Sequence, residues 1–350
     1  MIEIDGSMGE GGGQLLRYSV ALSVLLGKDV RIYNIRAKRS NPGLRPQHLA
    51  AVRTIASLAD AEVEGLSVGS MEVVVRPRRR PSGGPINVDI GTAGSISLLL
   101  QAVLPVLLFA EERAELKVIG GTTVRWAPPM PYMQHVLARL LELFGARVHL
   151  EVLRRGYYPR GGGIVRASVE PVERLEPVEL DEFEEIREIG GLSYASNLPA
   201  HIAHRQASAA RQRLEEAGYG RALREIEVDY KTPAIGRGTG IVLWALTDQA
   251  VLGGDSIGEV GKPAERVGRE AADKLVEELR ARAAVDEHAL DNLVIYTALA
   301  KGRSRIYARR MTSHAETAIA LCGTIAGARY RVYERGAGVV VEAEGIGLER

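Results

Sequence analysis

Residues Ile4 to Leu22 read IDGSMGEGGGQLLRYSVAL and join a short strand to an apolar helix through a loop with glycine at positions 9, 11, 12 and 13. Glycine adopts positive φ angles and lets a ligand approach the backbone, while the first N–H groups of the helix remain free to face it. Such a helix start attracts anions, phosphate above all. The loop lacks the spacing of a dinucleotide fingerprint, because Gln14 stands at the last glycine position, and it lacks the Gly-Lys-Ser/Thr of a P-loop. A glycine-rich turn without a ligand is the alternative.

The composition is that of an ordinary globular chain. Its 350 residues exceed the size at which one hydrophobic core usually stops growing, which predicts two domains. The net charge of +1 gives no global basic field, so a polyanion has to be met by a local patch. The single cysteine, Cys322, excludes an internal disulfide and most cysteine-based metal sites. The sequence enters a strand directly, without a charged-then-apolar leader, and we expect the protein in the cytoplasm.

Outward from the opening loop, the chain repeats itself. The loop, helix and strand from Gly9 resemble those from Gly91, and the helix and hairpin from Pro46 (PQHLAAVRTIASLADAEVEGLSV) resemble those from Met133 (MQHVLARLLELFGARVHLEVL). A further copy of loop, helix, strand and hairpin begins at Met311. Fixed-period similarity indicates one supersecondary unit used several times. We therefore predict an α+β fold with three repeated units of roughly 80 to 90 residues, each a small sheet with two helices.

Residues 184–280 interrupt this pattern. They follow the acidic run EPVERLEPVELDEFEE and contain strands of their own, REIEVDYK and GIVLWALTD, and a long helix from about Pro263. This composition predicts a small α/β domain inserted in the third unit. The predicted division is a large catalytic domain of three repeats, 1–183 and 281–350, and a small inserted domain, 184–280.

The third repeat carries a histidine where the first carries the glycine loop. In MTSHAE, from Met311, Ser313 and Glu316 have the spacing of a capping box, which predicts Ser313 as N-cap and His314 as the first helical residue. The positive end of a helix disfavours imidazolium and can hold a phosphate. A neutral histidine placed there could attack phosphorus and form a phosphoramidate. A surface histidine at a helix start is the alternative.

Several long, ordered motifs resemble the RNA 3′-terminal phosphate cyclase family over almost the whole chain. They are DGSMGEGGGQLLR, IRAKRSNPGLRPQHLAA, GTAGSISLLLQAVLP, GGTTVRWAPP, YYPRGGG and SHAETAIAL. The resemblance implies three repeats with one inserted domain. It also implies an ATP-dependent ligase that acts in RNA processing and converts an RNA 3′-phosphate to a 2′,3′-cyclic phosphodiester. A histidine is adenylylated, AMP moves to the RNA 3′-phosphate, and the neighbouring 2′-OH displaces AMP.

The resemblance also assigns roles to residues. His314 matches the nucleophile, and Glu10 matches a carboxylate that binds the divalent metal, Mg²⁺ or Mn²⁺; an oxygen ligand next to phosphates suits either ion. Gln101 matches an ATP-contacting glutamine, and as a polar residue inside an apolar helix it needs a partner, which can also be a local one. A nucleotide-binding segment matches His288, Ala289, Leu290, Asp291 and Asn292, with Pro128 and Pro129 as the opposite wall of the adenine pocket.

This chain departs from the family pattern in that segment. His288 stands where an aromatic residue often stacks, and Asn292 stands where glutamine is common. A second set of polar residues matches those that line the same cleft: Arg17, Arg36, Arg39, Gln47 and His48. Planar arginine side chains suit the phosphates of ATP and of the RNA end. Gln47 and His48 could also simply begin a helix.

Two other functions remain open at this stage. A non-catalytic relative that acts as a ribosome-assembly scaffold would lack the histidine nucleophile, and an enolpyruvyl transferase would share the repeated architecture without forming protein-bound AMP. Exposed sheet edges in repeated units could also support a homodimer.

Overall fold

The computed structural model describes residues 1–350, which form an α+β fold with four separate four-stranded sheets. The fold class predicted from the sequence is thereby confirmed. In the first sheet the strand order is β1-β2-β4-β3, and only β1 and β2 are parallel. Its elements are β1 (Ile2–Asp5), α1 (Gly13–Leu26), β2 (Val30–Tyr33), α2 (Pro46–Leu58), β3 (Glu62–Glu64) and β4 (Val73–Arg76).

The second and third sheets have the same pattern of one parallel and two antiparallel pairs, in the orders β5-β6-β8-β7 and β9-β14-β16-β15. The second comprises β5 (Gly84–Asp89), α3 (Ile96–Leu107), β6 (Ala114–Gly120), α4 (Met130–Tyr132), η1 (Met133–Leu137), α5 (Ala138–Leu143), β7 (Arg147–Arg154) and β8 (Gly163–Glu170). The third comprises β9 (Glu179–Leu180), α8 (Glu287–Leu299), β14 (Arg303–Ala308), α9 (Ser313–Leu321), η2 (Cys322–Ala326), β15 (Arg329–Arg335) and β16 (Gly338–Glu344).

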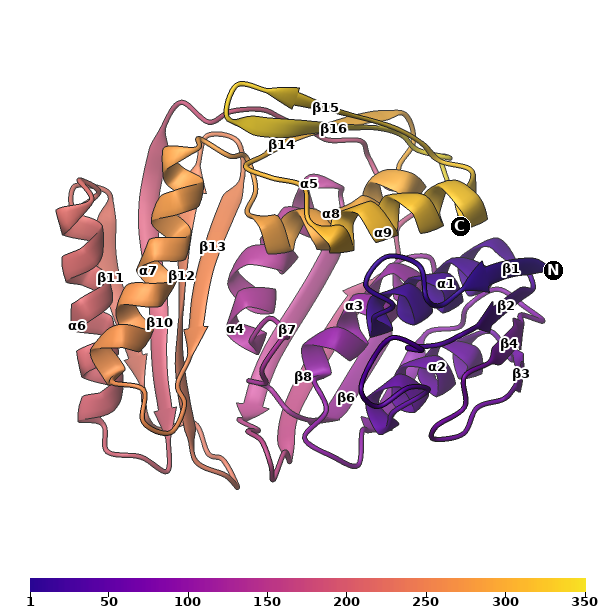
Figure 1. The fold of residues 1–350 in the computed structure, drawn as a ribbon, viewed down its shortest axis with the longest axis horizontal. Coiled ribbons are helices and arrows are strands. Elements are labelled where there is room, and N and C mark those ends of the chain that lie inside the picture. Colours follow the sequence, from indigo (N-terminus) through magenta and orange to yellow (C-terminus); the bar gives the residue numbers. More distant parts are fainter.

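The fourth sheet lies between β9 and α8 in the chain and has the order β11-β10-β12-β13. It comprises β10 (Ile186–Ser196), α6 (His201–Glu216), β11 (Leu223–Asp229), β12 (Gly238–Thr247), β13 (Val251–Ile257) and α7 (Ala264–Arg280). The two strands and the long helix predicted for this region correspond to β11, β12 and α7. Helices α6 and α7 pack on this sheet, at the left of Figure 1.

The helices of the other three sheets pack against one another in the middle of the molecule. Helix α1 contacts α2, α3 and α9, and α8 contacts α9 and α3. Figure 1 shows β14, β15 and β16 as a layer over α8 and α9 at the top, with β1 to β4 at the right. Buried and exposed residues alternate along β6 and β8, so one face of this sheet is apolar. The helices pack together in the middle because they bury such apolar sheet faces. The starts of α1 and α9 consequently meet near the centre.

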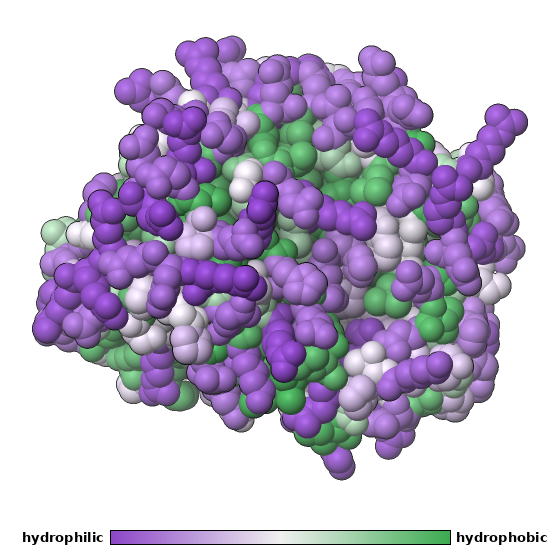
Figure 2. All heavy atoms as spheres, turned by 180° about the vertical axis from the view of Figure 1, so that it is seen from behind, coloured by the Kyte–Doolittle hydropathy of each residue, from purple (hydrophilic) through white to green (hydrophobic).

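The buried hydrophobic residues form two clusters. One has 76 residues, joins the first three sheets with their helices and also includes Val242, Trp244 and Val251 of the fourth sheet. The other has 16 residues and lies between the fourth sheet, α6 and α7. Viewed from behind, hydrophilic side chains cover most of the surface, with hydrophobic residues in separate patches between them (Figure 2). No helix has the length and apolar character needed to cross a membrane.

Candidate active site

The glycine loop opens into α1 without a side-chain cap. Gly9 and Gly11 have φ angles of 58° and 59°, in the left-handed region that favours glycine. The N-cap is Gly12, which has no side chain to accept a hydrogen bond from the helix start. The first N–H groups of α1 therefore have no capping side chain, which suits an anionic ligand.

Glu10 and His314 lie side by side although they are far apart in the sequence. Ser313, the residue before His314, follows Glu10 by 303 positions and contacts it as well. Oε2 of Glu10 is 4.0 Å from Nε2 of His314, and the Ser313 hydroxyl donates a hydrogen bond to Oε1. Arg39 donates to Oε2 at 3.2 Å. The hydrogen bond from Ser313 is the main cause that lowers the pKa of Glu10, and Arg39 makes a smaller contribution in the same direction. This carboxylate is therefore ionised at neutral pH.

His314 is half-exposed at the start of α9. Partial burial lowers its pKa from the ordinary value of 6.5, and Arg17 adds to this, whereas Glu10 acts in the opposite direction. The imidazole is therefore neutral at pH 7, with a ring nitrogen able to act as a nucleophile.

The predicted cap of this helix was wrong by one residue. The N-cap is Thr312, whose hydroxyl oxygen accepts a hydrogen bond from the backbone N–H of Ala315 at 3.0 Å. Ser313 is already helical, so His314 is the second helical residue, and the Glu316 side chain makes no capping hydrogen bond. The physical reason is that Ser313 uses its hydroxyl on Glu10, while Thr312 has the extended backbone that an N-cap needs.

Thr312 also joins α9 to α8, a contact that the sequence did not indicate. Its hydroxyl donates to Oδ1 of Asp291, and the backbone oxygen of Asp291 accepts from the hydroxyl of Tyr18 in α1 at 3.1 Å. Burial raises the pKa of Asp291 to about 7. Asp291 thus links the three helices that surround the candidate site.

Two buried side chains, Arg17 and His48, lie close to Gly13 at the start of α1. Arg17 is 6% exposed, forms no ion pair, and its Nε has no hydrogen-bond partner. His48 accepts a hydrogen bond from the Arg45 backbone N–H on Nδ1 at 3.0 Å. Burial lowers the pKa of His48 to about 3, aided by Arg17, so it stays neutral. A Cβ on Gly13 would lie 2.5 Å from His48 Nε2 and 3.0 Å from Arg17 Nη1.

The other predicted cleft residues, Arg36, Arg39 and Gln47, each form hydrogen bonds within the chain. Arg39 is bound to Glu10, whereas Arg36 donates to the backbone oxygens of Asn41 and Gly43 at 2.8 and 3.2 Å, within its own loop. The Gln47 amide oxygen accepts from the backbone N–H of Ser95, the N-cap of α3, at 3.4 Å. Gln47 thus connects the start of α2 to the start of α3.

The predicted nucleotide-binding segment begins α8. Ala289 and Leu290 belong to the hydrophobic core, and Asn292 donates to the backbone oxygen of His288 at 2.6 Å. His288 is half-buried, and its ring lies edge-on to that of Tyr132 with centroids 6.4 Å apart. Of this segment, His288 is therefore the more accessible side chain, whereas Asp291 is 8% exposed and one of its carboxyl oxygens already accepts from Thr312.

The predicted wall and the predicted glutamine lie among the elements of the second sheet. Pro129 is the N-cap of α4, the short helix that carries Tyr132, and Pro128 precedes it. Gln101 lies half-buried in α3, and its amide has no hydrogen-bond partner in the chain. Its donor and acceptor are thus free to meet a ligand.

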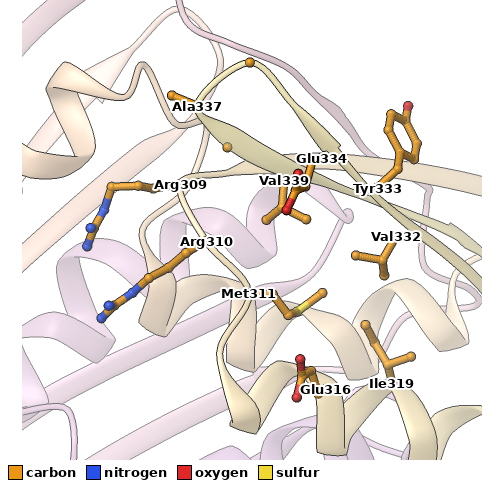
Figure 3. Close-up of a pocket in the computed structure, with 12 residues that line it drawn as sticks. Arg309, Arg310, Met311, Glu316, Ile319, Val332, Tyr333, Glu334, Ala337 and Val339 are labelled. Atoms are coloured by element: carbon orange, nitrogen blue, oxygen red, sulfur yellow. The ribbon is translucent and has the colours of Figure 1, made fainter.

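A cavity of about 780 Å³ lies next to α9, on the side facing the β15–β16 hairpin (Figure 3). Met311, Glu316, Ile319 and Val339 contribute to its lining, but His314 and Glu10 do not. Glu316 follows His314 by two positions, and residues two apart on a helix face different directions. This cavity is therefore separate from the residues described above.

Taken together, the site contains an ionised carboxylate, a neutral histidine, an unpaired buried arginine and an uncapped helix start. These groups suit a polyphosphate ligand: the arginine and the N–H groups match its charge, and the histidine can attack phosphorus. The carboxylate, the histidine, the arginine and the helix start were all predicted from the sequence, whereas the roles of Thr312 and Tyr18 were not. Thr312 is a capping residue type before the histidine, which was the available signal.

Comparison with known proteins gives a consistent result. A family model described as RNA 3′-terminal phosphate cyclase matches residues 8–332. An RNA 3′-terminal phosphate cyclase of Pyrobaculum aerophilum is 48% identical over 350 residues, covering 100% of this chain and 99% of the relative. One of Methanopyrus kandleri is 52% identical over 307 residues, covering 87% of each chain.

A solved structure, the enolpyruvyl transferase NikO from Streptomyces tendae, aligns with 99% of this chain and 50% of its own. Its TM-score is 0.39 at 12% identity, which is too low to support an argument about fold or function.

Proposed function

The chain belongs to the RNA 3′-terminal phosphate cyclase family, and its close relatives are named as enzymes. We propose that it converts an RNA 3′-terminal phosphate to a 2′,3′-cyclic phosphodiester with ATP, through a covalent histidine–AMP intermediate. The observation that carries the mechanism is the position of His314. It is a neutral histidine at a helix start, beside the ionised Glu10 and the uncapped start of α1.

In the first step, Nε2 of His314 attacks the α-phosphorus of ATP and the bond to pyrophosphate breaks. The imidazole then releases its Nδ1 proton, which leaves a phosphoramidate. Arg17 and Arg39 face the growing charge on the phosphates, and a buried arginine without a carboxylate partner is the stronger electrostatic group of the two. The unpartnered Arg17 Nε supports the assignment of an anion at this place.

Glu10 would hold the divalent metal. The chain has no cluster of three or more side chains that could bind a metal ion by themselves. One carboxylate next to a phosphate site nevertheless fits Mg²⁺ or Mn²⁺, because such ions take their other ligands from substrate phosphates and water. When bound, the ion would neutralise phosphate charge and polarise the phosphoryl group.

Three groups would hold the nucleotide. Asp291 and His288 lie at the start of α8, where the carboxyl group can hydrogen-bond the nucleoside and the imidazole can stack on the base. Gln101 offers a free amide from α3. Pro128 and Pro129 would close the adenine pocket from the side of Tyr132. Gln47 and His48 would support the start of α3 and the position of Arg17.

The second step moves AMP from His314 to the RNA 3′-phosphate. The P–N bond breaks, a phosphoanhydride forms, and the RNA end becomes RNA-(3′)pp(5′)A. The ribose 2′-OH then attacks the activated phosphorus, AMP leaves, and the ring closes. Closure is fast once the phosphate is activated, because the nucleophile is tethered beside it.

The predicted domain division accompanies this proposal. Three sheets share one strand order, first-second-fourth-third along the chain, which the fourth sheet does not have, and this supports three repeated units. The separate 16-residue core supports an inserted domain at about residues 184–280. The edge strands β3, β7 and β15 are the surfaces on which the proposed homodimer would depend.

The direct test is incubation of the protein with α-³²P-ATP and metal, followed by a denaturing gel. We expect an acid-labile, base-stable label that disappears in His314→Ala. His201→Ala is a matched control, because His201 also begins a helix but lies in α6. No label in the wild type would contradict the mechanism and favour the scaffold function. A label retained in His314→Ala would show that another residue is the nucleophile.

A further inference from the structure

Two aromatic rings near the candidate site lie almost entirely in solvent. Trp126 is 93% exposed and Tyr158 is 78% exposed. Trp126 also has a φ angle of 60°, a left-handed conformation that residues other than glycine adopt infrequently. Exposing large rings has no benefit for folding, since burial of apolar area is favourable. Such residues indicate a surface that meets a ligand.

The two rings belong to loops that pack together. Thr123 pairs with Tyr157 through an isolated bridge, which brings loop 121–129 to loop 155–163. A third loop, 232–238, packs on the second, because the Arg155 N–H donates to the Pro233 oxygen at 2.8 Å. It also brings the 47%-exposed side chain of Ile235 against Gly162, where a Cβ would lie 2.5 Å from it. We call loops 121–129, 155–163 and 232–238 together the loop surface.

The charge of the loop surface is positive. Arg160 and Arg237 are exposed and form no ion pair. The acidic groups that adjoin the loops are already neutralised: Asp229 pairs with Arg155 at 2.7 Å, and Glu259 pairs with Arg125 at 2.7 Å. Exposed rings interspersed with unpaired arginines are the pattern that binds single-stranded nucleic acid.

The loop surface is continuous with the candidate active site at two places. At Gly161, a Cβ would lie only 2.8 Å from Cα of Ala93, in the loop that leads into α3. The N-cap of α3 is Ser95, whose N–H contacts Gln47. In addition, Trp126 stands two positions before Pro128, the predicted wall of the adenine pocket. A strand whose 3′ end lies at His314 would thus have a path onto these loops.

We propose that the loop surface binds the single-stranded RNA nucleotides that precede the 3′-terminal phosphate. Trp126 and Tyr158 provide platforms on which bases stack, and Arg160 and Arg237 contact the backbone phosphates. Stacking and phosphate contacts read no base edges, so binding tolerates any sequence. This inference rests on the proposed function, because it takes the RNA terminus to lie at His314.

The test compares a long and a minimal substrate. The probes are a fluorescent single-stranded RNA of about 12 nucleotides and a dinucleotide, both with a 3′-phosphate. We expect Trp126→Ala to weaken binding of the long RNA about tenfold, and Trp126→Phe to keep most of the affinity. The double variant Arg160→Ala/Arg237→Ala should lower the slope of log K against log salt by about 0.7 for each arginine.

Two readouts should not change in these variants: the protein–AMP label formed with ATP alone and the cyclisation rate of the dinucleotide. Arg79→Ala is the matched control, since Arg79 is exposed and unpaired but lies in the loop after β4. Both substituted regions are exposed, and a thermal melt verifies folding.

Each result decides the question. Unchanged affinity for the long RNA in Trp126→Ala and in the double arginine variant overturns the inference. Unchanged RNA affinity together with a change in mass by light scattering assigns the loop surface to a contact between chains, which also overturns it. Failure of the proposed function is separate: the wild type then forms no AMP label and no cyclic product, whatever its RNA affinity.

Discussion

The hydroxyl of Thr312 donates a hydrogen bond to Asp291 and accepts one from the backbone N–H of Ala315. One side chain therefore begins the helix that carries His314 and fixes it to α8. Because Ser313 is held by Glu10 at the same turn, the start of α9 is bound on two sides. The position of the proposed nucleophile thus depends on residues that do not themselves react.

Thr312→Val should destabilise the protein and slow AMP labelling. Valine has a similar shape but supplies neither hydrogen bond, and loss of an N-cap costs about 1 kcal/mol. Thr312→Ser restores both groups and should restore most of the labelling rate. Urea denaturation and the single-turnover labelling rate measure the two effects. A Thr312→Val variant that is destabilised but labels at the normal rate would show that the cap has only a structural role.

Asp291 should make stability depend on pH. Its pKa in the folded chain is about 7, above the ordinary value of 3.8, so the folded state holds a proton that the unfolded state has lost. Stability from this group is present below about pH 4 and is lost as the pH rises to about 7. Asp291→Asn, which cannot ionise, should remove this decline.

The measurement is the free energy of unfolding of wild type and Asp291→Asn at pH 5 and pH 8. Glu278 is a suitable reference, because burial raises its pKa to about 7 as well, but it lies in α7 and pairs with Arg309 at 3.0 Å rather than with Thr312. Glu278→Gln should leave the contribution of Asp291 in place. Equal pH dependence in wild type and Asp291→Asn would contradict the protonation state assigned to Asp291.

Much of the fold was predictable from the sequence because its signals are local. The apolar run that becomes α3 and the alternation along β8 are read from residue types alone. The α+β class, the positions of β11 and β12, and the start of α7 follow from such patterns. The juxtaposition of Glu10 and His314 was expected from the repeat, which gives the two residues equivalent helix starts, and from the resemblance, since spacing along the chain alone gives no distance between residues so far apart.

Two features of the site could not be predicted from the sequence, because each depends on which neighbouring groups form hydrogen bonds with each other. Ser313 and Thr312 are both good capping residues, and the choice between them is decided by Glu10, which engages Ser313. Arg36 likewise bonds backbone oxygens of its own loop and has a positive φ angle of 55°, which its residue type does not indicate. Neither the N-cap of α9 nor the hydrogen bonds of Arg36 can be predicted from a local sequence pattern.

Gly13→Ala should damage the site more than a glycine substitution elsewhere. The new methyl would lie 2.5 Å from His48 Nε2, closer than atoms can approach, so His48 or Arg17 has to move. Overpacking of this kind costs about 1 to 3 kcal/mol. We expect weaker ATP binding by equilibrium titration as well as lower stability. Gly323→Ala is the control, because its methyl would have an ordinary contact at 3.7 Å; equal effects of the two would contradict the assigned role.

The pH dependence of AMP labelling tests the proposed nucleophile and its neighbour together. The pKa of His314 lies below its ordinary 6.5, so the neutral form dominates at pH 7 and the labelling rate should fall only at more acid pH. Glu10 raises the pKa of His314, since its negative charge favours imidazolium. Glu10→Gln should therefore move the acid limb to lower pH, and it should also increase the metal concentration needed for half-maximal rate.

Stopped labelling reactions from pH 4.5 to 8 at saturating metal separate the two effects. Glu316→Gln is the matched control, because it alters a carboxylate of the same helix turn that lines the neighbouring cavity and should leave the limb in place. A limb that does not move in Glu10→Gln would show that Glu10 does not act on the nucleophile.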